Sequence, residues 1–143
     1  MSKFIKFMKA NKIQKANEMH PVTASLCDEN GKPLDFEFRH ITSAENENIR
    51  AACTKDVPVT GKPGMYRPKV DTSTYVKKLI CASIVAPDMH DADLQDSYGV
   101  KTPEDLLMAM VDDPGEYQNL AAYVQQLQGF NINFEDKVIE AKN

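Results

Sequence analysis

Residues 73–130 hold the longest apolar segments of this 143-residue chain, and helix start signals separate these segments at short intervals. The tetrapeptides Thr-Pro-Glu-Asp at residues 102–105 and Asp-Pro-Gly-Glu at residues 113–116 each combine a capping side chain, a proline at the first helical position and an acid in the first turn. Apolar residues recur in steps of three and four, the period of an α-helix. These features predict a mainly α fold of the α+β class, a compact cluster of short helices.

Similar signals set the bounds of the first helices. A capping box at residues 42–45 predicts a helix over residues 43–54. Asp71 or Thr72 can cap a helix over residues 73–85, which should end there because a residue before proline, here Ala86, avoids the α region. A short helix is expected over residues 91–98, followed by Gly99 in the left-handed conformation.

The two helices that follow the Thr-Pro and Asp-Pro signals should form much of the core. Helical spacing predicts that they bury Leu106, Leu107, Met110, Val111, Tyr117, Leu120, Ala121, Val124 and Leu127. Asn133 should cap a last turn or two near the end of the chain.

Strand-like alternation is found only over residues 22–41. Two short runs with a period of two flank an Asn-Gly pair at residues 30–31, which predicts one antiparallel hairpin with a type I′ turn or a close relative. His40 falls on the same face as Phe36 and Phe38, where we expect it to pack at the strand end. The hairpin should precede a helical body over residues 42–143, within a single domain spanning residues 1–143.

Residues 55–71 contain three prolines and two glycines, which predicts a long loop, because proline lacks an amide hydrogen and has a fixed φ. Long loops in compact domains often bind partners. Tyr66 and Arg67 are therefore candidate partner-binding residues, and Lys69 could join them. A simple solvated connection is the alternative.

The segment over residues 1–21 is basic at its start. Five lysines and no acidic residue occupy its first fifteen positions, although the whole chain has a net charge of -4. Phe4, Phe7 and Met8 share one side of a helical turn, and we expect a short helix that packs this side on the body, with ordering on a partner as the alternative. These three residues are further candidate partner contacts, because they lie outside the predicted core.

Composition narrows the function classes. A net negative charge disfavours nucleic-acid binding, and no segment has the roughly 20 apolar residues of a membrane span, so we expect a soluble intracellular protein. Three widely separated cysteines predict free buried thiols. The cluster Asp88, His90, Asp91 and Asp93 could attract a metal ion, but helix-start chemistry explains it better. We therefore expect no catalytic residues, no metal and no cofactor, so the protein should not be an enzyme.

Several motifs together resemble the XkdN-like family of phage tail assembly chaperones. The specific part is Asp-Ala-Asp-Leu-Gln-Asp-Ser-Tyr-Gly-Val at residues 91–100, followed by Pro-Gly-Glu-Tyr at residues 114–117. Further short matches precede this part or lie within it: Gly31-Lys32-Pro33, Phe-Glu-Phe-Arg at residues 36–39, Ile41-Thr42, Ile49-Arg50, Tyr75 with Leu79-Ile80, Ala86-Pro87 and Leu106-Leu107. The resemblance covers roughly residues 22–143.

The resemblance implies a non-enzymatic chaperone of phage or prophage tail morphogenesis. Such a protein is expected to bind the tape-measure protein in the bacterial host cytoplasm and to assist assembly of the tail tube, with the tail-tube protein as a further partner. A structural tail or head-completion component that stays in the virion is the alternative. Self-association and a longer frameshifted form are left open.

Overall fold

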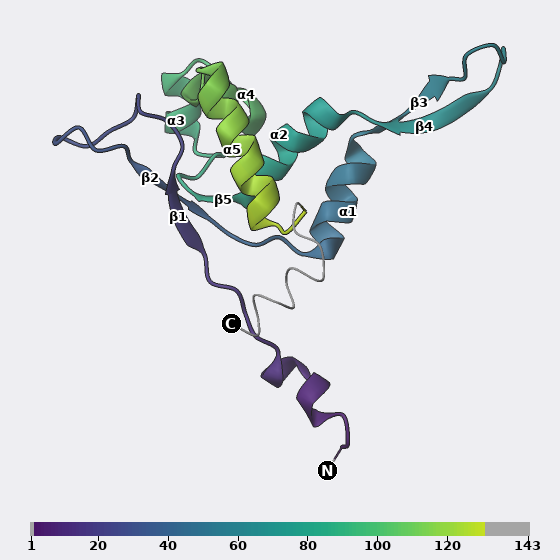
Figure 1. The fold of residues 1–143 in the computed structure, drawn as a ribbon. Helices are drawn as coiled ribbons and strands as arrows, with labels where there is room; N and C mark the ends of the chain where they lie inside the picture. The colour runs from purple at the N-terminus through teal and green to yellow at the C-terminus, as the bar shows by residue number, and fades with distance from the viewer. Residues whose placement is uncertain (1, 131–143) are drawn as a thin grey trace.

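The computed structural model describes residues 2–130 and shows a mixed α+β fold (Figure 1). Five α-helices accompany two sheets in this range, one with the strand order β1-β2-β5 and one with the order β3-β4. The prediction of a mainly α chain with a single N-terminal hairpin is therefore wrong. Two segments expected to be loop or helix are strands, and their pairing depends on tertiary contacts.

The three-stranded sheet is antiparallel throughout. β1 (Glu18–Pro21) pairs with β2 (Asp35–Phe38) in a register that sets Glu18 opposite Phe38 and Pro21 opposite Asp35. β5 (Ile84–Ala86) pairs with the other edge of β2. Side chains on β2 alternate as predicted, with Phe36 and Phe38 buried.

The hairpin is present, but its first strand lies earlier in the chain than predicted. The Gly31 amide donates to the Asp28 carbonyl at 3.0 Å, so Glu29 and Asn30 are the central residues of the turn. Neither has the positive φ that a type I′ turn requires, and only Gly31, the fourth residue, is left-handed with a φ of 82°, so the predicted type I′ turn is not formed. Only a bridge between Cys27 and Pro33 continues the ladder next to the turn. Residues 22–25 lie outside the ladder, where the Thr23 hydroxyl and the Ala24 amide donate to the Glu116 carboxylate at 2.7 and 2.8 Å.

The predicted helix starts are confirmed. Thr42, Asp71, Asp91, Thr102 and Asp113 each accept a backbone amide hydrogen bond at the start of a helix. These helices are α1 (Ser43–Ala52), α2 (Thr72–Ser83), α3 (Ala92–Ser97), α4 (Pro103–Met110) and α5 (Pro114–Leu127). Gly99 has the predicted left-handed φ of 69°. The turn expected after Asn133 lies outside the described residues.

α2 ends two residues earlier than predicted. Its last residue is Ser83, and the next three residues form β5, which pairs with β2. Ile84 and Val85 are β-branched residues that suit a strand, and the open edge of β2 supplies the partner that helical periodicity could not reveal. The segment that follows α2 thus forms the third strand of the sheet.

The core lies where α2, α4 and α5 pack together against the sheet (Figure 1). Phe38, Leu79, Ile80, Leu106, Leu107, Val111 and Val124 have at most 1 % of their surface exposed. All nine predicted core positions of α4 and α5 are buried or packed against this core. His20 stacks on Tyr123 with 3.8 Å between the ring centroids, which joins β1 to α5.

The predicted loop over residues 55–71 is in fact mostly a β-ribbon, and the loop prediction is wrong. β3 (Thr54–Pro58) pairs antiparallel with β4 (Tyr66–Val70), from Thr54 opposite Val70 to Pro58 opposite Tyr66. Prolines are tolerated because both strands of a two-stranded ribbon are edge strands. Gly61 and Gly64, with φ of 78° and 81°, turn the chain at its tip.

Candidate partner-binding surfaces

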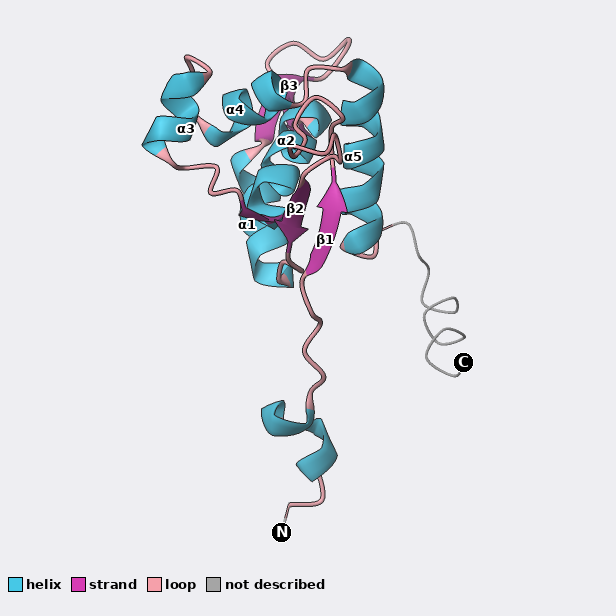
Figure 2. Ribbon diagram, turned by 90° about the vertical axis from the view of Figure 1, so that its left-hand side faces the viewer, coloured by secondary structure: helices cyan, strands magenta, loops and turns pink. Residues whose placement is uncertain are grey.

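The N-terminal arm, residues 2–17, extends away from the body of the protein (Figures 1 and 2). It contains two short 3₁₀ helices, Ile5–Phe7 and Lys9–Asn11, and none of its residues is buried. The expectation that its apolar side packs on the body is therefore wrong. Five lysines this close together repel one another, and the arm buries too little apolar surface to fold back by itself.

Apolar side chains of the arm are unusually accessible. Phe4 is 60 % exposed, Phe7 83 % and Ile13 89 %. The two phenylalanine rings meet edge to face with 6.2 Å between their centroids, and the Lys3 ammonium lies 5.9 Å from the Phe4 ring. The arm thus presents a small aromatic cluster among cations, a chemistry suited to apolar partners with negative charge.

The β3-β4 ribbon is the second protrusion, and it leaves the body in another direction (Figure 1). Lys55, Lys62, Arg67 and Lys69 oppose a single acid, Asp56, so the ribbon is also basic. Met65 and Tyr66 are 54 % and 64 % exposed. A two-stranded ribbon is marginally stable alone, so this one can gain from contact with a partner.

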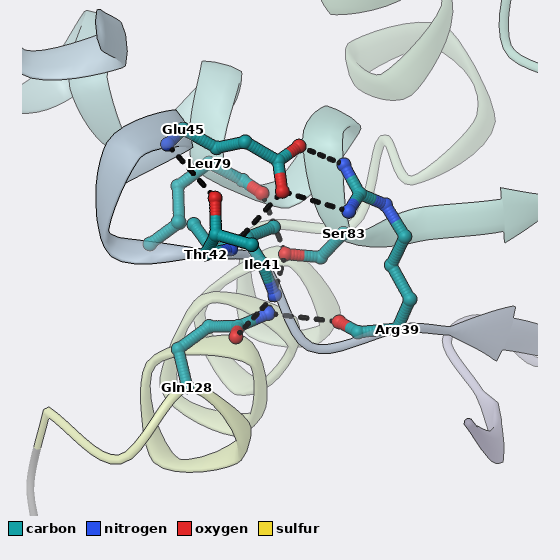
Figure 3. A network of polar contacts seen from close by, with 7 residues as sticks. All are labelled: Arg39, Ile41, Thr42, Glu45, Leu79, Ser83 and Gln128. Atoms are coloured by element: carbon teal, nitrogen blue, oxygen red, sulfur yellow. Dashed lines mark hydrogen bonds and ion pairs between the residues drawn. The ribbon is translucent and has the colours of Figure 1, made fainter. Parts of the chain in front are cut away.

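Polar contacts stabilise the connection between β2 and α1, the helix that leads into the β3-β4 ribbon (Figure 3). The Gln128 side chain, at the end of α5, accepts a hydrogen bond from the Ile41 amide at 3.0 Å. Its amide group donates to the Arg39 carbonyl at 3.0 Å and to the Ser83 hydroxyl at 2.9 Å. Gln128 therefore joins β2, α2 and α5 at one point.

The next contact in this network fixes the start of α1. Arg39 forms two hydrogen bonds to the Glu45 carboxylate, which also accepts from the Thr42 amide at 3.0 Å. The guanidinium, followed by the Thr42 amide, lowers the pKa of Glu45 to about 2. The carboxylate thus stays charged at neutral pH and keeps the capping box closed.

A shallow apolar groove lies where α4 meets α5. Its volume is about 340 Å³, and its lining comprises Met108, Val111, Asp112, Pro114, Tyr117 and Gln118. Burial raises the pKa of Tyr117, which agrees with its position against the core. The sequence gives little sign of this groove, because Met108 lies beside the buried positions of α4 and looks like an isolated exposed residue.

Within the acidic cluster at residues 88–93, Asp91 caps α3 and Asp93 lies in its first turn, as predicted. The Asp91 carboxylate accepts the Leu94 amide at 2.9 Å, and the Asp88 carboxylate accepts the His90 amide at 3.0 Å. Within residues 2–130, no group of three or more His, Cys, Asp or Glu side chains is arranged to hold a metal ion. In the same range, no helix combines the length and apolar character of a membrane span.

The five predicted partner-binding residues do not form one site. Phe4, Phe7 and Met8 lie on the arm, whereas Tyr66 and Arg67 lie on the ribbon (Figure 1). Their role in binding stays a prediction. Sequence reasoning missed the exposed residues Ile13 on the arm and Met65 on the ribbon. The available signal was the position of Met65 beside Tyr66 and of Ile13 among the lysines of the arm.

Comparison with known proteins shows to which family the chain belongs. The model of the family described as phage XkdN-like tail assembly chaperone protein matches residues 4–142. The match confirms the resemblance seen in the sequence and extends it into the N-terminal arm, where the sequence motifs gave no sign of it.

Two curated proteins of Bacillus subtilis strain 168 are similar over 137 residues. XkdN of the phage-like element PBSX is 24 % identical, and the uncharacterised protein YqbN is 23 % identical. Each alignment covers 96 % of this chain and 91 % of the relative. The crystal structure of YqbN superposes with a TM-score of 0.74 at 18 % identity, covering 92 % of this chain and 99 % of that one, so the fold is shared.

Proposed function

Because the chain belongs to the phage XkdN-like tail assembly chaperone family, we propose that it is a non-enzymatic chaperone that binds the tape-measure protein and assists tail-tube assembly. It would act in the bacterial host cytoplasm, where tails are assembled. The tail-tube protein is a second partner in this proposal.

The observation that carries the proposal is the exposed apolar chemistry of the two protrusions. Phe7 on the arm and Tyr66 on the ribbon are 83 % and 64 % exposed, with lysine or arginine beside them. Large aromatic side chains without a buried environment mark interaction surfaces. A long client with apolar, helix-prone segments offers such side chains a surface to cover.

Two protrusions at separate places on a small body suit an elongated client. Each contact buries little surface, but linked contacts raise the effective concentration of the second one. Basic side chains around the aromatic residues favour client segments with acidic residues and speed encounter. The client is therefore expected to be held at more than one point along its length.

The test is co-expression with the tape-measure protein encoded in the same tail gene cluster, followed by pull-down. We expect the wild-type chain to keep the client soluble and to be recovered with it. The double variants Phe4→Ser with Phe7→Ser and Tyr66→Ser with Arg67→Ser should each recover less client. Leu34→Ser is a matched control, because Leu34 is an exposed large apolar residue outside both protrusions.

A client that is equally soluble and unbound without this chain would overturn the proposal. Mass spectrometry of purified virions addresses the alternative of a structural tail or head-completion component. A chaperone should be missing from finished particles, and recovery of this chain at the stoichiometry of a tail protein would contradict the proposed role.

A further inference from the structure

The groove between α4 and α5 combines an apolar floor with acidic surroundings. Met108, Val111, Pro114 and Tyr117 supply the apolar lining. Residues 102–130 contain five acidic side chains and no lysine or arginine. Asp112 lines the groove, and Asp105 and Asp113 lie close in sequence to groove residues, whereas the Glu116 carboxylate is bound to Thr23 and Ala24. A matching occupant carries a large apolar side chain flanked by cations.

The same chain presents such an occupant on its arm. Phe4 and Phe7 form an aromatic pair, and Lys3, Lys6 and Lys9 alternate with them along the segment. A groove of about 340 Å³ lies at the small end of binding clefts, so it suits one or two side chains rather than a folded domain. Size and charge therefore agree between the arm and the groove.

The arm and the groove of one molecule lie at opposite ends of it. Figures 1 and 2 both show the N-terminus beyond the start of β1, whereas α4 and the first turn of α5 lie at the other end. We propose that the arm of one copy docks in the α4-α5 groove of a second copy, with the Phe4 and Phe7 rings against Met108 and Tyr117 and the arm lysines near Asp112 and Asp113.

Two different patches meet in this contact, so it is heterologous. Repetition of the contact gives a ring if the rotation between copies closes and a chain of copies if it does not. A mutual exchange of arms between two copies would close the assembly at the dimer. In each case, every occupied groove removes one arm from solvent.

The self-association does not require the proposed client. If the client also uses Phe4 and Phe7, as proposed above, it competes with the groove for the same side chains. Docked arms would then be protected from non-specific contacts until the client displaces them. The experiment below contains no client, so its failure and the failure of the chaperone function are separable.

The experiment is sedimentation velocity of the full chain over about a hundredfold range of concentration, in about 0.1 M and about 1 M NaCl. The arm variant carries Phe4→Ser and Phe7→Ser, and the groove variant carries Met108→Lys, which places a cation at the groove. Met108 is 38 % exposed, so its substitution spares the core. Leu34→Ser is again the matched control.

We expect the wild type and the control to associate with rising concentration in low salt. High salt and either variant should weaken this association about tenfold or more. The decisive sample is an equimolar mixture of the two variants. The intact arm of one and the intact groove of the other should form a one-to-one complex at concentrations at which each variant alone stays monomeric.

Three results would overturn the inference. The first is a wild type that remains monomeric over the whole range. The second is a wild type whose association neither variant weakens, and the third is a mixture of the two variants that fails to form the complex. Circular dichroism of each variant checks that the fold is retained, and Tyr117→Ser offers a second groove substitution if Met108→Lys fails to fold.

Discussion

Replacement of Gln128, the residue that follows the last turn of α5, by alanine should clearly destabilise the protein. The side chain makes three hydrogen bonds, to the Ile41 amide, the Arg39 carbonyl and the Ser83 hydroxyl (Figure 3). Alanine at this position leaves an amide and a carbonyl of the β2-α1 connection without these partners. The Ser83 hydroxyl keeps its bond to the Leu79 carbonyl at 2.8 Å.

The size of the effect follows from these contacts. A net contribution of about 1 kcal/mol for each hydrogen bond gives a loss of about 3 kcal/mol in the free energy of unfolding. The half-buried location argues against a smaller value, because water replaces the lost partners only in part. For a chain of this size, the melting temperature should fall by roughly 10 °C.

Urea denaturation followed by circular dichroism measures the difference, with Gln126→Ala as the control. Gln126 lies two residues earlier, in the last turn of α5, and is exposed, so its replacement makes the same chemical change without the loss of these contacts. Gln128→Met keeps most of the volume and removes the hydrogen bonds, and it should lose nearly as much stability as Gln128→Ala. The reasoning is refuted if Gln128→Ala lies within about 0.5 kcal/mol of Gln126→Ala.

Three further predictions concern pH, backbone conformation and thiol chemistry. The pKa of Glu45 falls from 4.5 in the unfolded chain to about 2 in the folded one, so its contribution to the free energy of unfolding is complete above pH 4.5 and is lost as the pH falls towards 2. Because its side chain is 38 % exposed, Glu45→Gln should lower the free energy of unfolding by only about 1 kcal/mol at pH 7. Urea titrations should show that the difference between the variant and the wild type disappears in acid. Gly99→Ala should destabilise by about 1 kcal/mol because the φ of Gly99 is 69°, whereas Gly115→Ala, inside α5, should be neutral or stabilising in thermal melts. Cys27 is exposed, contrary to the expectation of buried thiols, and should react with a thiol reagent in the native protein. Cys81 is partly buried, and burial raises its pKa to about 12, so it should react much more slowly than Cys27; equal rates for the two thiols would contradict this environment of Cys81.

The helices were predictable because their signals are local. A threonine or aspartate oxygen caps amides two or three residues away, and a proline at the first helical position has the φ that the helix needs. These signals act within one turn, so the starts at Thr42, Asp91, Thr102 and Asp113 could be read without knowledge of the fold. The core of α4 and α5 followed from the same periodicity.

The partner surfaces were predictable only in part. Exposed aromatic residues outside the core helices pointed to the arm and the ribbon, although the arm was expected to pack on the body. The α4-α5 groove was not predictable, because it forms from the end of one helix and the start of another. A single residue such as Met108 gains meaning only when Pro114 and Tyr117 lie beside it.

The sequence by itself determined where each helix begins, which faces of α4 and α5 are buried, and to which family the chain belongs. The tertiary structure decided the strands, because a strand is stable only with a partner that lies elsewhere in the chain. Thr23 and Ala24 bind Glu116 and lie outside the hairpin ladder. Ile84–Ala86 pair with the edge of β2, and β3 pairs with β4 although both strands contain proline. These features depend on contacts between residues that are far apart in the sequence, and the periodicity of a short segment does not indicate such contacts.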